Sequence, residues 1–364
     1  GVKFKTFNKQ EHDSDVPPRK IQRIVEDKNG YIWVKTIDRK LYVFNKVTEC
    51  FHAVYDDMKN YSENIQVIKL QNTAEGDVLL LTKDKNLLLA GVDEKGQVTI
   101  KILFDSRDEI NKHDYTLKHH VLCETEEYIS WIGTDYKVSA VHKGAELASR
   151  PADFITSKIN SGDKDSFTSF FEDGRKVWVG DRAGIFYSID VRTGLVNRYV
   201  LSEIKGAISN LLVTPAGYVY LSVAGQGTYE YDLAERRLQK INTEMNDAMV
   251  THAFIDQYDK IWFHENEKAL IYYDPLNHTA KRFPFTMFGK ITTLYSEDAG
   301  ERGLFFLSPA GEAWLFDREH AEMVYINKLK QLSNDRANQQ FYHLMLDNDC
   351  LLYTSPSPRD YAAS

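Results

Sequence analysis

One stretch that recurs along the chain decides the fold: Ile24-Val25-Glu26-Asp27-Lys28-Asn29-Gly30-Tyr31-Ile32-Trp33-Val34-Lys35-Thr36. It is an apolar run, then an acidic turn, then an apolar residue followed by tryptophan. Further copies run through Phe170–Asp181 and Phe254–Phe263. In all three copies a polar residue follows twelve positions after the tryptophan, at Asn45, Asp190 and Asp274. The stretch is therefore a structural repeat.

The same offset locates weaker copies, which centre on Leu79, Trp131, Tyr220 and Phe305. The tryptophan slot falls at 33, 79, 131, 178, 220, 262 and 305, at steps of 46, 52, 47, 42, 42 and 43 residues. Within a copy, four short apolar runs are joined by turns rich in Asp, Asn, Gly and Thr. This pattern predicts an all-β fold, a β-propeller of four-stranded antiparallel blades. We predict seven blades, or eight if the two ends of the chain close an additional blade.

The repeats divide the chain into four segments. Residues 1–16 are expected to hold a lone outer strand and a lead-in, and residues 17–327 the seven propeller repeats. Residues 328–350 are expected to hold a polar linker and the start of a further repeat. Residues 351–364 break the rhythm and contain two closely spaced prolines, so we interpret them as a non-native tail.

The repeat resembles the two-component regulator propeller repeat, whose pattern is ED-x-x-G-x-(I/L)-W-(I/V)-G-T followed by a short Leu-(Tyr/Phe) strand. The copies at Trp33, Trp178 and Trp262 match this pattern well, and the copy at Trp131 keeps Trp-Ile-Gly-Thr. The copies at Leu79 and Phe305 are degenerate. The resemblance covers about residues 17–354.

The resemblance implies the periplasmic sensor region of a Bacteroidetes hybrid two-component system. Such a module would bind a glycan or oligosaccharide and signal to a histidine kinase. It would stand beside a second propeller and downstream signalling domains in a longer chain, and the full-length protein could form a homodimer. Kinase motifs are absent from this sequence, so we expect the segment itself to be non-catalytic. The alternatives are a protein-interaction scaffold and, with less support, a propeller lyase or glycosidase.

Composition agrees with a large folded domain and argues against a nucleic-acid or membrane-surface partner. Hydrophobic residues make up 43% of the chain and aromatic residues 12%, enough to bury an extensive core. The net charge is −8 and no basic block is present, which argues against binding to nucleic acid or to a membrane surface. The 3 cysteines form no CxxC pair, so neither a disulfide scaffold nor a cysteine zinc site is expected.

The ligand face of a propeller is usually built from the loops that join second and third strands and from those that join successive blades. Polar residues in the second-to-third loops suit hydrogen bonding to sugar hydroxyls or to an acidic or sulfated glycan. The alternative interpretation is that these turns are polar because they are solvated. Our candidate ligand-binding residues are Asp38, Arg39, Asp84, Lys85, Asp135, Tyr136, Asp181, Arg182, Gln226, Asn266 and Glu267. Insertions at 56–64, 105–116 and 143–164 are further candidates, with Tyr55 and Tyr61 able either to stack on a sugar or to pack.

We predict no catalytic residues, no metal site and no cofactor. His264-Glu265-Asn266-Glu267 lacks the second histidine of a zinc-protease helix. The adjacent pair His119–His120 would point to opposite faces of a strand, which is poor geometry for chelation. Two acidic pairs could suggest calcium but lie in turns, where aspartate is favoured for turn hydrogen bonds. These pairs are Asp256 with Asp259 and Asp347 with Asp349.

Overall fold

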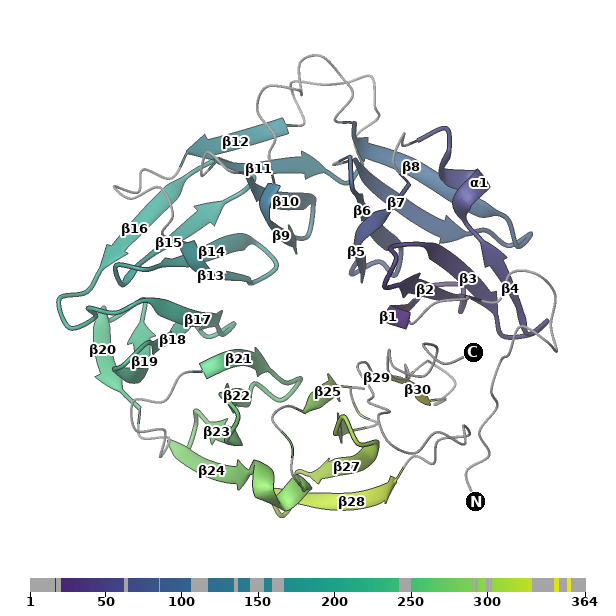
Figure 1. Ribbon diagram of the computed structural model, residues 1–364. Coiled ribbons are helices and arrows are strands. Elements are labelled where there is room, and N and C mark those ends of the chain that lie inside the picture. Colours follow the sequence, from purple (N-terminus) through teal and green to yellow (C-terminus); the bar gives the residue numbers. More distant parts are fainter. Residues whose placement is uncertain are drawn as a thin grey trace. The chain divides into compact units, whose positions relative to one another are not determined.

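The computed structural model describes residues 17, 21–61, 65–84, 86–105, 117–133, 137–144, 154–158, 167–241, 250–289, 291, 294–298, 301, 303–328, 344–346 and 352–354. It confirms the all-β prediction. Seven four-stranded antiparallel sheets form a β-propeller, and the described residues include one four-residue α-helix, α1 (Tyr55–Met58), and one 3-10 helix, η1 (Phe285–Phe288) (Figure 1). We name the sheets blades A to G in chain order.

Each blade is four consecutive strands. Blade A contains β1 (Ile21–Glu26), β2 (Ile32–Thr36), β3 (Leu41–Asn45) and β4 (Cys50–Ala53), and blade B contains β5 (Val67–Asn72), β6 (Val78–Thr82), β7 (Leu87–Val92) and β8 (Val98–Phe104). Blade C contains β9 (Leu117–Glu124), β10 (Tyr128–Gly133), β11 (Lys137–His142) and β12 (Phe154–Lys158). Blade D contains β13 (Phe167–Glu172), β14 (Lys176–Asp181), β15 (Ile185–Asp190) and β16 (Val196–Val200). Blade E contains β17 (Ile208–Val213), β18 (Tyr218–Val223), β19 (Gly227–Asp232) and β20 (Arg237–Lys240), and blade F contains β21 (Val250–Ile255), β22 (Ile261–Glu265), β23 (Ala269–Asp274) and β24 (Thr279–Pro284). Blade G contains β25 (Tyr295–Asp298), β26 (Leu304–Leu307), β27 (Glu312–Asp317) and β28 (Glu322–Lys328).

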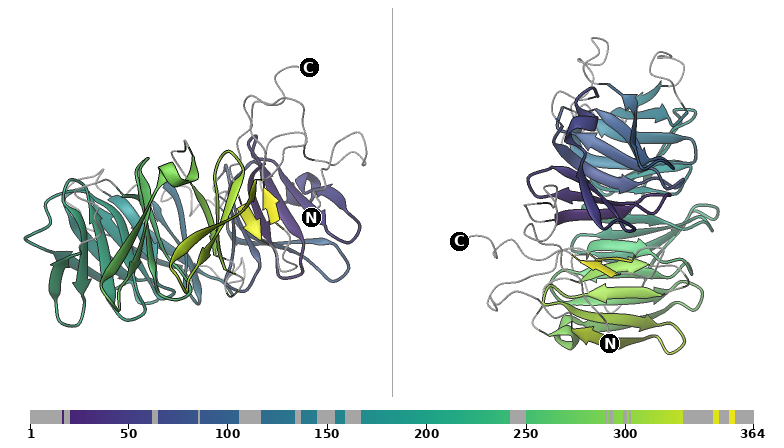
Figure 2. Two further views of the ribbon diagram at one scale, coloured as in Figure 1. Left: turned by 90° about the horizontal axis from the view of Figure 1, so that it is seen from below. Right: turned by 90° about the vertical axis from the view of Figure 1, so that its right-hand side faces the viewer.

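The chain divides into two units, which we describe separately. Unit 2 (residues 114–293) holds blades C to F, and unit 1 (residues 1–113 and 294–364) holds blades A, B and G. Within unit 2 the blades stand side by side, and the first strands of neighbouring blades contact each other, β13 with β17 and β17 with β21 (Figures 1 and 2). In unit 1, β1 contacts β5 in the same way.

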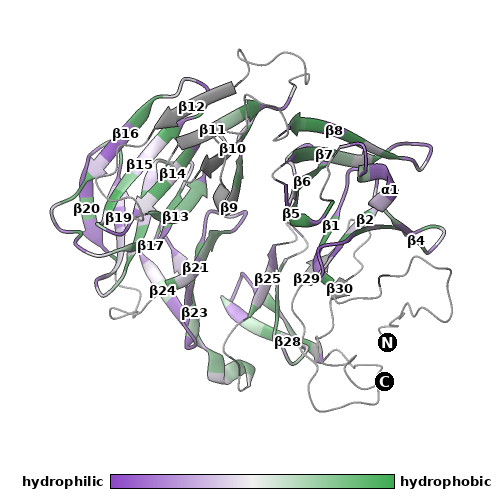
Figure 3. Cartoon of the chain, turned by 45° about the horizontal axis from the view of Figure 1, so that its top comes forward, coloured by the Kyte–Doolittle hydropathy of each residue, from purple (hydrophilic) through white to green (hydrophobic). Residues whose placement is uncertain are grey.

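The second and third strands of each blade form the core. Every residue of β2 and of β6 is buried, and β7 has a single partly buried position. Figure 3 shows β7 and β8 mainly in the green of hydrophobic residues. The fourth strand β4 alternates between exposed and partly buried residues instead. Since packing against neighbours covers both faces of the middle strands, these strands are buried along nearly their whole length and are mostly apolar.

The tryptophan slot lies in the second strand of all seven blades. Trp33, Trp178 and Trp262 are at most 2% exposed, so they are packing residues. Each indole N–H also donates to an aspartate of the preceding turn, with N–O distances of 2.8 Å to Asp27, 2.7 Å to Asp173 and 3.2 Å to Asp256. The other carboxylate oxygen of these aspartates accepts backbone N–H groups of the turn. The acidic turn and the tryptophan are therefore one structural unit.

The twelve-residue offset has a similar cause. Asn45, Asp190, Asp232, Asp274 and Asp317 each end a third strand. Their side-chain oxygens accept backbone N–H groups of the next hairpin, for example from Arg192 at 3.0 Å and Thr193 at 2.9 Å to Asp190. Asx turns of this kind start the connection to the fourth strand.

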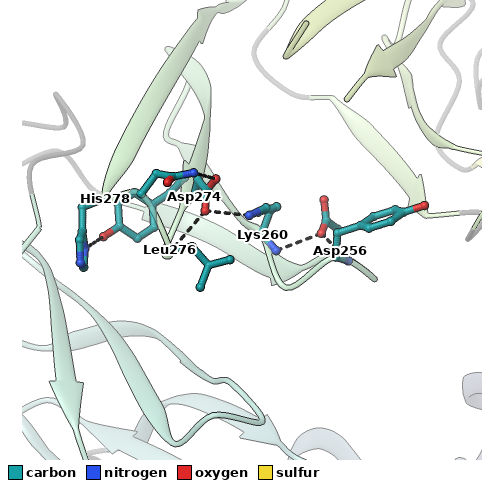
Figure 4. A network of polar contacts seen from close by, with 8 residues as sticks. Asp256, Lys260, Asp274, Leu276 and His278 are labelled. Atoms are coloured by element: carbon teal, nitrogen blue, oxygen red, sulfur yellow. Dashed lines mark hydrogen bonds and ion pairs between the residues drawn. The ribbon is translucent and has the colours of Figure 1, made fainter. Parts of the chain in front are cut away.

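A lysine ties the two acidic turns of blade F together (Figure 4). Lys260 donates its backbone N–H to Asp256 at 3.0 Å and its ammonium to Asp274 at 2.7 Å. Asp274 also accepts the backbone N–H of Leu276 at 3.0 Å. The first-to-second and third-to-fourth hairpins thus sit at one end of the blade. The second-to-third hairpin lies at the opposite end.

Tyr220 replaces tryptophan in blade E and finds another acceptor. Its hydroxyl donates to Glu230 of β19 at 2.6 Å, and Gln239 of β20 donates to the other oxygen of that carboxylate at 2.6 Å. Burial, together with the bond to Glu230, raises the pKa of Tyr220. The degenerate repeat therefore keeps a buried, hydrogen-bonded aromatic in the slot.

The structure describes only part of the chain outside the seven blades. The expected strand within residues 1–16 lies outside the described residues. A two-stranded sheet follows blade G, formed by β29 (Leu344–Leu346) and β30 (Leu352–Thr354), and β29 contacts β25. The insertion after blade A begins with α1, where Tyr55 is exposed under the Lys59 ammonium and Tyr61 packs against the core.

Candidate functional site

The first strand carries a β-bulge at its second residue in five blades. The register shifts at Gln22, Ile68, Thr168, Ser209 and Thr251 in blades A, B, D, E and F. Bulges interrupt the ladder and redirect side chains, and they are common beside binding sites. The recurring bulge therefore marks one end of the blade, the end that also holds the second-to-third hairpins.

Polar side chains near the bulge repair the ladder and link neighbouring blades. Ser209 Oγ donates to the carbonyl of Ser222 at 3.2 Å, and Thr251 Oγ1 to that of His264 at 3.3 Å. Thr168 Oγ1 donates across to the Ile208 carbonyl of the next blade at 2.7 Å. One residue past its own bulge, the Asn210 amide donates to the Val250 carbonyl at 2.7 Å.

Two residues after the tryptophan slot, a position faces this bulge. We call it slot+2; in chain order it is occupied by Lys35, Leu81, Gly133, Gly180, Ser222, His264 and Leu307. Glycine is needed in blade D because a Cβ at Gly180 would collide with Ser169 Oγ and lie 2.8 Å from Ile208 Cγ2. Lys35 and His264 are the large polar exceptions. A side chain that departs from a packing repeat at a bulge is a candidate for function.

In unit 1, Lys35 reaches from β2 toward blade B. The residue is 6% exposed, and its ammonium donates to Gln22 Oε1 at 2.7 Å and to the Ile68 carbonyl at 2.5 Å. Burial, and then the nearby Arg39 guanidinium, lower the pKa of Lys35 to about 8. Lysine at slot+2 therefore meets the bulge residue of its own blade and the bulge residue of the next.

In unit 2, His264 pairs across the ladder with His252 of β21. His264 Nδ1 lies 3.4 Å from Thr251 Oγ1, and its ring lies 5.0 Å from that of Phe285. Burial lowers the pKa of His252, and burial followed by His252 lowers that of His264 to about 4. Both imidazoles are therefore neutral at pH 7, and His252 keeps an exposed face beside the exposed Thr251.

Four of the predicted site residues are engaged in hydrogen bonds within the protein, three in their own turns and Gln226 with the segment that joins blades D and E. Asp38 accepts the Thr36 hydroxyl at 2.6 Å, and Asp84 accepts that of Thr82. Asp181 is 2% exposed, accepts the backbone N–H groups of Ala183 and Ile185, and has its pKa raised mainly by burial. The amide of Gln226 bridges the Lys205 N–H at 2.7 Å and the Glu203 carbonyl at 3.0 Å.

Four others present their side chains to solvent at the same end of their blades. These are Arg39 in blade A, Arg182 in blade D, and Asn266 and Glu267 in blade F. Arg39 and Glu267 have positive φ angles of 65° and 53°. The remaining three candidates, Lys85, Asp135 and Tyr136, lie outside the described residues.

Sequence reasoning missed the slot+2 residues as a set. The signal was present, because aligning the copies on tryptophan places Lys35 and His264 where the family pattern has glycine. Their bulge partners Gln22 and Thr251 could not be found this way. The bulge is a register property of the paired strands and leaves no fixed sequence mark.

The described residues contain neither a metal-binding cluster nor a helix able to span a membrane. Among them, no group of three or more His, Cys, Asp or Glu side chains is arranged to hold a metal ion. Asp256 serves its turn and Trp262, as the turn interpretation predicted, while Asp347 and Asp349 lie outside the described part. No helix in the described part of the chain has the length and apolar character needed to cross a membrane.

The sequence matches no family model and no curated protein. The structure is similar to virginiamycin B lyase from Staphylococcus aureus at 11% identity and a TM-score of 0.50, over 79% of this chain and 91% of that chain. A catalytically inactive variant of that lyase with quinupristin gives 10% identity and a TM-score of 0.51, over 80% and 94%. At these identities the likeness establishes the propeller fold alone.

Extracellular domains of proteins described as two component systems are also among the similar structures. The extracellular domain of a B. thetaiotaomicron protein described as a hybrid two component system gives 15% identity and a TM-score of 0.46. The match covers 93% of this chain and 52% of that chain. This chain therefore spans about half the length of that domain.

Proposed function

We propose that the chain is a non-catalytic, extracytoplasmic sensor module that binds an oligosaccharide at the slot+2 end of its blades. In this proposal it belongs to a periplasmic hybrid two-component system, and binding passes to a kinase through other domains. Differential binding to two domain arrangements would carry the signal.

The observation that carries the proposal is the placement of large polar side chains at slot+2. Lys35 and His264 stand where blade D has an obligate glycine, and each lies at the end of its blade that presents exposed hairpin residues. Fixed backbone with exposed polar side chains is the usual construction of a recognition surface. The sequence resemblance to sensor propellers supplies the ligand class.

Calorimetry of the purified chain against a panel of host and plant oligosaccharides tests the proposal. We expect one class to bind and Arg182→Ala or Asn266→Ala to weaken binding by several-fold. Arg236→Ala is the matched control, because Arg236 is exposed in the third-to-fourth hairpin of blade E, at the opposite end. Equal loss in the control variant, or no binding across the panel, would contradict the proposal.

A second candidate function is a lyase, and the imidazole pair of blade F favours it. A neutral imidazole can accept the proton from the carbon next to the C–O bond that breaks in an elimination. The C–H electron pair then forms the double bond, and the leaving oxygen departs with the C–O electron pair and takes a proton from water. Mass spectrometry of oligosaccharides incubated with the protein would detect the unsaturated product, and His264→Ala would abolish it. Recovery of all substrates unchanged would eliminate this candidate.

A further inference from the structure

The most buried lysine among the described residues has no acidic partner. Lys46, Lys143 and Lys260 are partly buried, and each pairs with a carboxylate, those of Glu26, Glu124 and Asp274. Lys35 is 6% exposed, yet its recorded acceptors are the neutral Gln22 amide oxygen and the Ile68 carbonyl. A buried ammonium that lacks a counter-charge is costly, so it requires a reason.

A second cation stands at the same place. Arg39 follows Lys35 by four residues in the second-to-third hairpin, and it is exposed. Its backbone is fixed on both sides, since its N–H donates to the Thr36 carbonyl at 2.9 Å and its carbonyl accepts the Val67 N–H at 2.8 Å. The nearby Asp38 carboxylate is engaged by the Thr36 hydroxyl. In the part of the chain described, neither Lys35 nor Arg39 forms an ion pair with a carboxylate.

The backbone at Arg39 adds an independent argument. Arg39 has φ 65°, and the equivalent hairpin positions of blades D and G are Gly184 and Gly311, with φ of 83° in both. A side chain in the left-handed region costs about 1 kcal/mol compared with glycine. Arginine therefore holds this exposed hairpin position at a cost in stability relative to glycine.

The two cations repel each other in the free protein. The Arg39 guanidinium contributes to the lowered pKa of Lys35, after burial. A bound anion would reverse both effects, because it supplies the missing counter-charge and separates the like charges. An ammonium with one remaining N–H and a planar guanidinium fork are a suitable pair for a carboxylate or a sulfate.

We propose that the second-to-third hairpin end of blade A is an anion subsite, in which the Lys35 ammonium and the Arg39 guanidinium bind the carboxylate or sulfate of an acidic oligosaccharide. The inference rests on the proposed function for the oligosaccharide part of the ligand. The anion part depends only on the geometry of Lys35, Gln22 and Arg39. The ligand of the sensor is thereby narrowed to uronate-containing or sulfated glycans.

The test compares matched probes by calorimetry: a galacturonate trisaccharide, the neutral galactose trisaccharide, and sodium sulfate. We expect the acidic trisaccharide to bind at least about tenfold more tightly than the neutral one, as a charge-assisted contact provides. Arg39→Gln and Lys35→Met should each weaken acidic binding by about ten- to hundredfold. Lys28→Met is the control, since it removes the same charge from the opposite end of blade A.

The outcomes separate the two proposals. If sulfate binds and Arg39→Gln abolishes its binding, while no oligosaccharide binds, the anion subsite stands and the oligosaccharide sensor fails. Equal binding of acidic and neutral trisaccharides, unchanged in both variants, overturns the anion subsite and supports the sensor. Should Lys35→Met not fold, the ¹³C NMR titration of the Lys35 amine replaces it: sulfate must raise its pKa, and an unchanged pKa overturns the subsite.

Discussion

Glu172 offers a sharp test of the electrostatics at the junction of blades C and D. It ends β13, its carboxylate accepts the backbone N–H of Glu124, and its Oε2 is buried without a hydrogen-bond partner among the described residues. Burial, followed by the neighbouring charges of Glu124 and Asp173, raises its pKa from 4.5 to about 7. The nearby Lys143 ammonium forms its ion pair with Glu124.

The sign follows from proton binding. Between pH 4.5 and about 7 the folded state holds a proton on Glu172 that the unfolded state has released, so stability falls as pH rises through this window. Each pH unit in this window lowers the free energy of unfolding by about 1.4 kcal/mol, which gives about 3 kcal/mol over the whole window. Because the carboxyl keeps partial access to water, we expect about 2 kcal/mol.

Glu172→Gln should therefore stabilise the protein by about 2 kcal/mol at pH 8 and change little at pH 4.5. The glutamine carbonyl keeps the bond to the Glu124 N–H and removes the buried charge. Urea unfolding of both proteins across this pH range measures the difference. Glu127→Gln is the control, since Glu127 is exposed in the β9–β10 turn of blade C, close in sequence to Glu124. Parallel stability curves for wild type and Glu172→Gln would refute the reasoning.

Three further predictions concern the repeat itself. Asp27→Ala should cost about 3 kcal/mol, because it leaves the buried Trp33 indole N–H and two turn N–H groups without acceptors, and thermal unfolding measures this loss. Gly180→Ala should cost about 2 kcal/mol by overpacking against Ile208, as measured by urea unfolding. Glu267→Gly should raise stability by about 1 kcal/mol by relieving its positive φ, and under the proposed function should weaken oligosaccharide binding at the same time. A Glu267→Gly variant that is less stable than wild type would contradict the strain argument.

Periodicity made the fold predictable, for a physical reason. Trp33, Trp178 and Trp262 each lie in a second strand, five or six residues after an aspartate that closes the preceding turn and accepts the indole N–H. The residue twelve positions later ends the third strand because it closes the next turn. Because these hydrogen bonds join residues a few positions apart, the sequence pattern predicts them. They survive even in blade E, where Tyr220 changes its acceptor to Glu230.

The candidate site was predictable only to the level of the hairpins. Sequence could indicate that the second-to-third loops are polar, but it could not separate Asp181, buried within its turn, from the exposed Arg182 beside it. It also could not bring Gln22 to Lys35, because that contact depends on a one-residue register shift. The burial of Asp181 and the Gln22–Lys35 contact both depend on how strands pair in the folded protein, which the local sequence pattern does not specify.

The side-chain bonds between first strands have a mechanical consequence. The Thr168 hydroxyl donates a hydrogen bond to the Ile208 carbonyl, and the Asn210 amide donates one to the Val250 carbonyl. These bonds link β13 to β17 and β17 to β21. A displacement imposed on β13 is therefore transmitted to β17 and from there to β21. Force applied to blade D would travel along this line of linked first strands into blades E and F.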